Sequence, residues 1–126
     1  MKTLQVLETA YRATVEEQDD TIVWLAHAMK GAGGDVAVLL TGNAVCYGVK
    51  EQRAPALAIG GWVQDHPADI AADLAALAAK GVALHAIEED LEERGLLEAP
   101  LLDALAVMPR AQLPRLFDEY PRIWKW

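Results

Sequence analysis

Short apolar runs alternate with amphipathic stretches along this chain of 126 residues. Four of these runs predict β-strands, over residues 4–7, 35–41, 82–87 and 105–108. The run 35–41 is almost continuously apolar, as expected for a strand that is covered on both faces of a parallel sheet. Strands that alternate with helical segments indicate a parallel sheet covered by helices.

Between these runs, apolar residues recur at the spacing of a single helix face. Thr14 and Glu17 have the spacing of a capping box, which predicts that a helix starts there. A second helix is predicted to open at Pro67 and to end at Gly81. The two apolar faces consist of Ile22, Leu25, Ala26 and Met29 in the first helix and of Ile70, Leu74, Leu77 and Ala78 in the second.

The remaining segments are shorter. Residues 44–50 predict a short helix, 51–64 a loop, and 113–120 one or two amphipathic turns before Pro121. Glu88, Glu89 and Asp90 open a further helix that Arg94 and Gly95 close, an order of charges that matches the helix dipole. We therefore expect one domain over residues 1–126, a flavodoxin-like three-layer α/β/α fold with four or five parallel strands.

Composition narrows the classes of function. Hydrophobic residues form 53% of the chain, which excludes a disordered protein. The net charge of −8 disfavours direct binding to nucleic acid. The single cysteine, Cys46, excludes an internal disulfide and a multi-thiolate metal site. Because the sequence also has no glycine-rich phosphate loop and no dinucleotide fingerprint, we expect no cofactor and no metal.

The chain has no cationic and apolar leader, and no apolar run reaches the roughly 18 residues that a membrane span requires. We therefore expect a cytoplasmic protein that does not associate with membranes.

Two segments resemble the DsrE/DsrF/DsrH (TusB/TusC/TusD) sulfur-relay family. Residues 36–45, VAVLLTGNAV, resemble its second strand and the following "GDAV" or "QDGV" turn. Residues 84–96, LHAIEEDLEERGL, are similar to a stretch of the DsrH/TusB branch, in which a terminal tryptophan such as Trp126 also recurs. The first and the long middle helix look more like the DsrE/TusD type.

The resemblance implies persulfide transfer by a cysteine at the end of the third strand, seven residues before the Arg94-Gly95 pair. In this chain that relay position is Ile87, and the second cysteine of some members is replaced by Asp90. An alkyl side chain cannot carry sulfur. We therefore expect an accessory, non-catalytic subunit of a sulfur-relay complex, with Glu88 and Glu89 beside the former site. A cysteine introduced at residue 87 is expected to be accessible and only modestly acidic.

Two other interpretations remain open. Cys46 follows the second strand near the start of a short helix, where free N–H groups can activate a thiol. It would then be the catalytic residue of a sulfur carrier or sulfurtransferase, although its apolar neighbours favour an inert, packed cysteine. Alternatively, the strand ends and the loop 51–66 form a small-molecule site. The sequence leaves open whether the chain is an enzyme and whether it serves tRNA thiolation or sulfur oxidation.

Aromatic residues point to assembly. Trp62 lies in the irregular loop, and Trp124 and Trp126 lie on a terminal tail, where such rings are typical of interfaces. The family resemblance implies trimers or hexamers of identical or homologous subunits, with TusA- or TusE-like carriers as further partners. His85 is expected in the interior, and His27 in solvent.

Overall fold

The computed structural model describes residues 2–126, and its centre is a parallel sheet of five strands in the order β6-β5-β2-β1-β7. All four neighbouring pairs are parallel. Consecutive strands are therefore joined by crossovers, as the alternating pattern of the sequence predicts. The strands are β1 (Lys2–Leu7), β2 (Asp35–Leu40), β5 (Ala83–Ile87), β6 (Leu105–Met108) and β7 (Arg122–Lys125).

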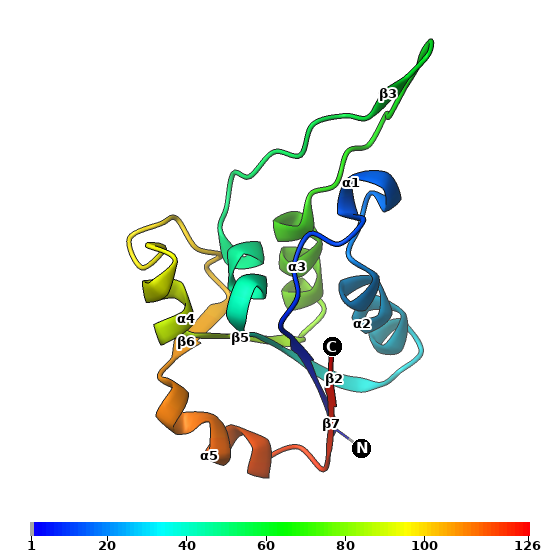
Figure 1. Cartoon of the computed structure of the whole chain (residues 1–126). Helices are drawn as coiled ribbons and strands as arrows, with labels where there is room; N and C mark the ends of the chain where they lie inside the picture. Colours follow the sequence, from blue (N-terminus) through cyan, green and yellow to red (C-terminus); the bar gives the residue numbers. More distant parts are fainter. Residues whose placement is uncertain (1) are drawn as a thin grey trace.

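Helices cover the two faces of the sheet unequally. Figure 1 shows α5 alone on one face, while the other face carries α2, α3 and the short helix η1, with α4 at the β5–β6 end. The α-helices are α1 (Thr14–Glu17), α2 (Thr21–Gly31), α3 (Ile70–Ala79), α4 (Glu88–Glu93) and α5 (Leu113–Asp118), and the 3-10 helices are η1 (Gly42–Gly48) and η2 (Arg110–Gln112).

The core consists of two clusters that the sheet separates. The larger one joins the inner sides of β2 and β5 to α2, α3 and η1, and it contains the fully buried Leu74, Leu77 and Tyr47. The smaller one lies under α5 and contains Leu4, Leu39, Ile87, Met108 and Leu116 among others. Successive residues of a strand point to opposite faces, so β1, β2, β5 and β6 each contribute to both clusters, whereas the exposed β7 contributes to neither. The three-layer α/β/α prediction is confirmed, with five parallel strands.

The capping box predicted at Thr14 and Glu17 is wrong. Thr14 is the first residue of α1, which has four residues, follows a left-handed Ala13 and has no side-chain cap. The cap belongs to the next helix, where the carboxylate of Asp20 accepts hydrogen bonds from the backbone N–H groups of Ile22 and Val23. Asp20 thus satisfies two donors that would otherwise lack a partner at the start of α2.

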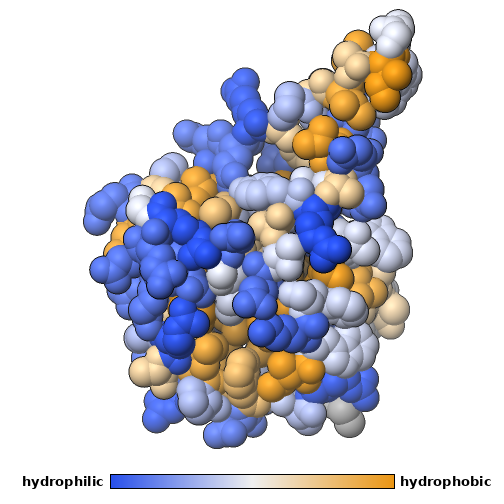
Figure 2. All heavy atoms as spheres, viewed as in Figure 1, coloured by the Kyte–Doolittle hydropathy of each residue, from blue (hydrophilic) through white to orange (hydrophobic). Residues whose placement is uncertain are grey.

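The predicted loop 51–64 contains a small antiparallel hairpin, formed by β3 (Ala58–Ile59) and β4 (Trp62–Val63). Gly60 turns it with a φ of 61°, a backbone conformation that glycine adopts without strain. The hairpin projects from the body of the molecule (Figure 1), and its apolar side chains colour its tip in Figure 2. All six residues from 58 to 63 are exposed.

The terminal tail forms an edge strand. Residues 122–125 pair with β1, and the backbone N–H of Trp126 donates to Val6 at 3.0 Å. Its indole Nε1 donates to the buried Gln5 side chain at 2.6 Å. The tail is therefore part of the sheet.

Candidate functional site

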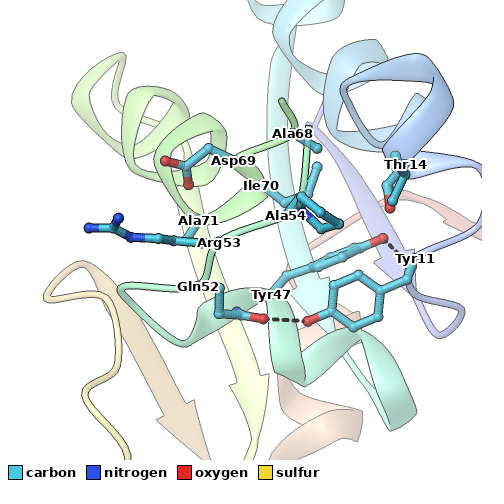
Figure 3. Close-up of a pocket in the computed structure, with 12 residues that line it drawn as sticks. Tyr11, Thr14, Tyr47, Gln52, Arg53, Ala54, Ala68, Asp69, Ile70 and Ala71 are labelled. Carbon is cyan, nitrogen blue, oxygen red and sulfur yellow. Dashed lines mark hydrogen bonds between the residues drawn. The ribbon is translucent and has the colours of Figure 1, made fainter. Parts of the chain in front are cut away.

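The segments that follow β1 and β2 border a pocket of about 310 Å³. Open parallel sheets place their ligand crevices at the carboxyl ends of the strands. The walls come from the segment after β1, from η1, from the two ends of the projecting segment and from the start of α3 (Figure 3). Most of the lining is apolar, and its chemically distinctive members are Tyr11, Thr14, Tyr47, Gln52, Arg53 and Asp69.

Two tyrosine rings form the floor of this pocket. Tyr47 is fully buried and packs edge-on against Tyr11, with ring centroids 5.1 Å apart and an angle of 84° between the planes. The Tyr47 hydroxyl donates to the Asp20 carboxylate at 2.7 Å and accepts from the backbone N–H of Tyr11 at 2.7 Å. The hydroxyl of Tyr11 donates to the Gln52 side chain (Figure 3). The cap of α2 is thus joined to the pocket floor.

Both tyrosines stay protonated well above neutral pH. Burial, and next the hydrogen bond to Asp20, raise the pKa of Tyr47 far above its ordinary value of 10.0. Burial raises the pKa of Tyr11 as well, and the charge of the nearby Cys46 adds to this. Neither phenol is therefore suited to act as a general base near pH 7, and their rings serve as packing surfaces.

A hydroxyl and a helix start complete the pocket. Thr14 is only 4% exposed, and Figure 3 shows its hydroxyl pointing toward the tyrosines with no hydrogen bond drawn to another lining residue. Asp69 caps α3 by accepting from the backbone N–H of Ala72, which leaves those of Ile70 and Ala71 without an intrahelical acceptor.

The relay position lies at the other end of the same sheet edge. Ile87 is the last residue of β5, where the third predicted strand was expected to end. Its side chain is 0% exposed and belongs to the cluster under α5. The expectation of an accessible side chain at residue 87 is therefore wrong, because the alternation along β5 places this side chain in the core. The register counted from Arg94 and Gly95 required an accessible residue 87, so the family resemblance loses this support.

The acidic residues after Ile87 are held by other parts of the chain. The carboxylate of Asp90, which is 6% exposed, accepts from the backbone N–H of Gly42 at 2.8 Å and from Arg110 Nη2 at 2.5 Å. Glu89 accepts from the backbone N–H of Arg110 at 3.0 Å. The three acids do occupy the first turn of α4, but no side chain caps that helix. Asp90 instead links α4 to the turn after β2 and to η2.

Arg94 and Gly95 follow α4, as predicted. The guanidinium of Arg94 donates through Nε and Nη2 to the side chain of Asn43, at 3.1 and 2.9 Å. Through Nη1 it also donates to the backbone carbonyl of Asp90 at 2.9 Å. Gly95 has a φ of 66°. Of the predicted flanking residues, Glu89 and Arg94 thus belong to one network with Asp90, whereas Glu88 is exposed and takes no part in it.

Cys46 is the fifth residue of η1, so it does not lie at the helix start that was expected to activate its thiol. It is partly buried, while its neighbours Val45 and Tyr47 are fully buried in the core. Its backbone carbonyl accepts from Gln52 Nε2 at 2.6 Å. The side chain is not part of the pocket lining.

The environment predicted for His85 agrees with the structure, and the one predicted for His27 does not. His85 is partly buried, and burial lowers its pKa, as expected for an interior histidine. His27 is not free in solvent, because Nε2 lies 2.9 Å from the backbone carbonyl of Asp73 and Nδ1 lies 3.1 Å from Lys80 Nζ. It joins α2 to α3.

The three tryptophans expected at interfaces all keep open surface, with exposed fractions of 55% for Trp62, 38% for Trp124 and 47% for Trp126. The sequence analysis did not single out Trp24, which is 58% exposed on α2. In the described part of the chain, no cluster of three or more potential ligands is suited to a metal ion. None of its helices combines the length and apolar character of a membrane span.

No family model matches the sequence, and no curated protein matches it either. Solved structures do match. The YchN protein from E. coli superposes with a TM-score of 0.72 at 17% identity, over 100% of both chains. The chain therefore has the same fold as YchN. BT1422, a conserved protein of unknown function from Bacteroides thetaiotaomicron, matches with a TM-score of 0.64 at 14% identity, over 98% of this chain and 94% of its own.

These identities establish the fold alone, so the site must be argued from the residues themselves. The sequence pattern did not indicate the pocket floor, nor Thr14 as a lining residue. Asp20 carried a usable signal, because it stands directly before the periodic stretch of α2, as an N-cap does. Tyr11 and Tyr47 carried none, since they lie 36 positions apart and meet only through the fold.

Proposed function

We propose that this chain is an accessory, non-catalytic subunit of a cytoplasmic sulfur-relay complex. The observation that supports this is the residue at position 87. At the strand end where the family resemblance places the sulfur-carrying cysteine, this chain has an alkyl side chain, which cannot carry sulfur. The support is this missing thiol and not the burial of Ile87, because a relay position should be accessible. The three-layer α/β/α fold that the chain shares with YchN is consistent with this role.

The absence of relay chemistry is tested by mass spectrometry after incubation with a persulfide donor. We expect the intact protein to gain no stoichiometric sulfur, because residue 87 has no thiol and Cys46 lies outside the relay position. The Cys46→Ser variant is the matched control, since the other residues remain unchanged. A gain of one sulfur atom per wild-type chain that disappears in Cys46→Ser would contradict the proposal and support a carrier that uses Cys46.

An accessory subunit must associate with other subunits, and the projecting hairpin is the surface best suited to this. Residues 56–63 carry no charged side chain, whereas the whole chain has a net charge of −8. Ile59, Trp62 and Val63 are between 53% and 65% exposed. An uncharged apolar arm allows contact between acidic subunits without bringing like charges together.

Light scattering on wild type and on two tryptophan variants tests this interface. We expect a trimer or hexamer, formed by this chain alone or together with homologous subunits. Trp62→Ser should shift the assembly toward smaller species. Trp24→Ser, which removes a comparably exposed ring from α2, should leave it intact. A monomeric wild type in the presence of homologous subunits, or equal effects of the two substitutions, would contradict the proposal.

A further inference from the structure

The pocket beside Tyr11 and Tyr47 carries an inference that does not depend on the sulfur-relay proposal. We propose that it binds a small, uncharged, ring-containing molecule with an amide or carbonyl group. The ring would lie against the tyrosines, and the polar group would reach Thr14 and the start of α3. The volume of about 310 Å³ lies at the lower end of the range for ligand pockets, which suits a molecule with one ring.

Thr14 is the first observation that points to a ligand. Thr14 is only 4% exposed, and Figure 3 shows its hydroxyl pointing toward the tyrosines with no hydrogen bond to another lining residue. Within residues 2–126 no fully enclosed side-chain oxygen or nitrogen lacks a partner, so this hydroxyl is the accessible part of Thr14 and faces the pocket. Water satisfies this hydroxyl when the pocket is empty, and a ligand with a polar group can take the place of that water.

The start of α3 is the second observation. Ile70 and Ala71 line the pocket, and their backbone N–H groups have no acceptor within the helix. These donors favour an oxygen acceptor. The carboxylate of Asp69 already balances the positive end of this helix, so a carbonyl oxygen fits better than a second anion.

The rest of the lining excludes a strongly charged ligand. Arg53 and Asp69 are exposed, and in Figure 3 both side chains extend away from Thr14 and the tyrosines. The interior is formed by the two tyrosine rings and by small apolar residues such as Ala54 and Ala68. Tyr47 is fully buried, whereas Tyr11 is 49% exposed, so the ring of Tyr11 is the aromatic surface against which an entering ring can pack.

The segment that covers the pocket is strained, as expected of a binding loop. Tyr11, Ala13 and Gln18 all have φ values between 53° and 63°, although none is glycine. Such conformations persist where the surrounding structure holds them, and they are frequent at ligand sites. This strain keeps Thr14 over the pocket.

The experiment is an NMR titration of the full chain with benzamide as the probe. We expect saturable shifts of the amide signals of Thr14, Ile70 and Ala71. Benzoate has the same ring with a charged group, and it should bind more weakly by about fivefold or more because Asp69 and the acidic chain repel it. Cyclohexanecarboxamide, which lacks the aromatic ring, should also bind more weakly.

Two variants assign the binding to this pocket. Thr14→Val keeps the shape and removes the hydroxyl, so benzamide should bind about fivefold more weakly or worse. Ala54→Leu should abolish binding by filling the space, while an unchanged melting temperature shows that the chain still folds. No saturable shifts, equal binding of benzoate, or full binding to Thr14→Val would overturn the proposal. Binding seen only in Trp62→Ser would also overturn it, because the arm of another subunit would then occupy the pocket.

Discussion

The two ends of the sheet's carboxyl edge use their polar groups in opposite ways. At the β5 end, Asp90 is bound to Gly42 and Arg110, and Ile87 is sealed beneath α5. At the β1–β2 end, the hydroxyl of Thr14 faces a pocket and bonds to no other lining residue. The segment 84–96, which resembles the DsrH/TusB branch, therefore lies where Asp90 is hydrogen-bonded within the chain and Ile87 is buried. The residues that line the pocket at the open end lie outside both segments that resemble the sulfur-relay family.

This difference suggests that the two ends have separate roles. A network in which each polar group has a partner holds elements together, and it has no free donor or acceptor for a substrate. A hydroxyl that faces a cavity and bonds to no neighbouring side chain has the opposite character. We interpret the β5 end as a structural support, and the β1–β2 end as the part of the edge that can still bind a molecule.

The largest expected effect is that of Asp90→Ala. Removing this carboxylate leaves the N–H of Gly42 and the guanidinium of Arg110 without their acceptor, so we expect a loss of about 2–4 kcal/mol in the free energy of unfolding. Urea denaturation measures it. Asp103→Ala is the control, because Asp103 also pairs with a cation but is 94% exposed, and its removal should leave the midpoint unchanged. Equal effects would show that the β5 end is not a support.

Burial at the relay position is tested by Ile87→Cys in a Cys46→Ser background. We expect slow alkylation of this thiol in the folded protein, because residue 87 is 0% exposed. The substitution should also cost about 1–2 kcal/mol of unfolding free energy, since it removes buried methyl groups. Glu88→Cys in the same background is the control and should react rapidly, because Glu88 is exposed. Similar alkylation rates at both positions would mean that the β5 end opens readily.

Most of the sheet could be predicted from the sequence, because the four runs that form β1, β2, β5 and β6 are long or strongly apolar. The fifth strand was missed, since Arg122–Lys125 is short and fully exposed and follows a proline. The hairpin was missed too, although two apolar pairs around Gly60 and Gly61 have the spacing of a tight turn.

The site was harder to predict than the fold. Periodicity correctly placed Ile87 at the end of a strand, but it could not tell which face the residue would occupy without the positions of α5 and β6. The pocket depends on contacts between Tyr47, Asp20 and Tyr11, which lie far apart in the sequence. Such contacts leave no local pattern in a single sequence.

Ionisation of Tyr47 in the pocket floor predicts a pH-dependent change in unfolding free energy that is intermediate in size. Folding favours the protonated form of Tyr47, whose pKa lies above the ordinary value of 10.0. The stability that this contributes is complete below pH 10 and is lost as the pH rises further, because the unfolded chain then ionises first. We expect the wild type to lose stability more steeply above pH 10 than Tyr47→Phe. At pH 7 that variant should lose about 1–2 kcal/mol, the value of its hydrogen bonds.

Tyr11→Phe is the matched control for Tyr47→Phe. Its hydroxyl bonds only to Gln52 at the exposed rim, so its loss at pH 7 should be smaller, about 0.5 kcal/mol or less. Chemical denaturation between pH 7 and 11 measures both variants. If the two behaved alike, the hydrogen bonds between Tyr47, Asp20 and Tyr11 would not hold the floor of the pocket.

The smallest expected effect on stability is that of His85, whose titration reports whether water reaches the β5 end of the sheet. His85 and Ile87 are two positions apart on β5 and therefore point to the same face of the sheet, the one under α5. Burial lowers the pKa of His85 below its ordinary value of 6.5, although the charge of Glu119 opposes this. The folded state thus favours the neutral ring. The resulting stability is present above pH 6.5 and is lost as the pH falls, because the unfolded chain binds the proton more readily.

We expect His85→Gln to lose less stability than wild type between pH 8 and 5, measured by urea denaturation at each pH. An identical pH dependence of the two proteins would mean that water reaches the sheet beneath α5, and the contrast between a closed and an open end would then hold only for the network around Asp90.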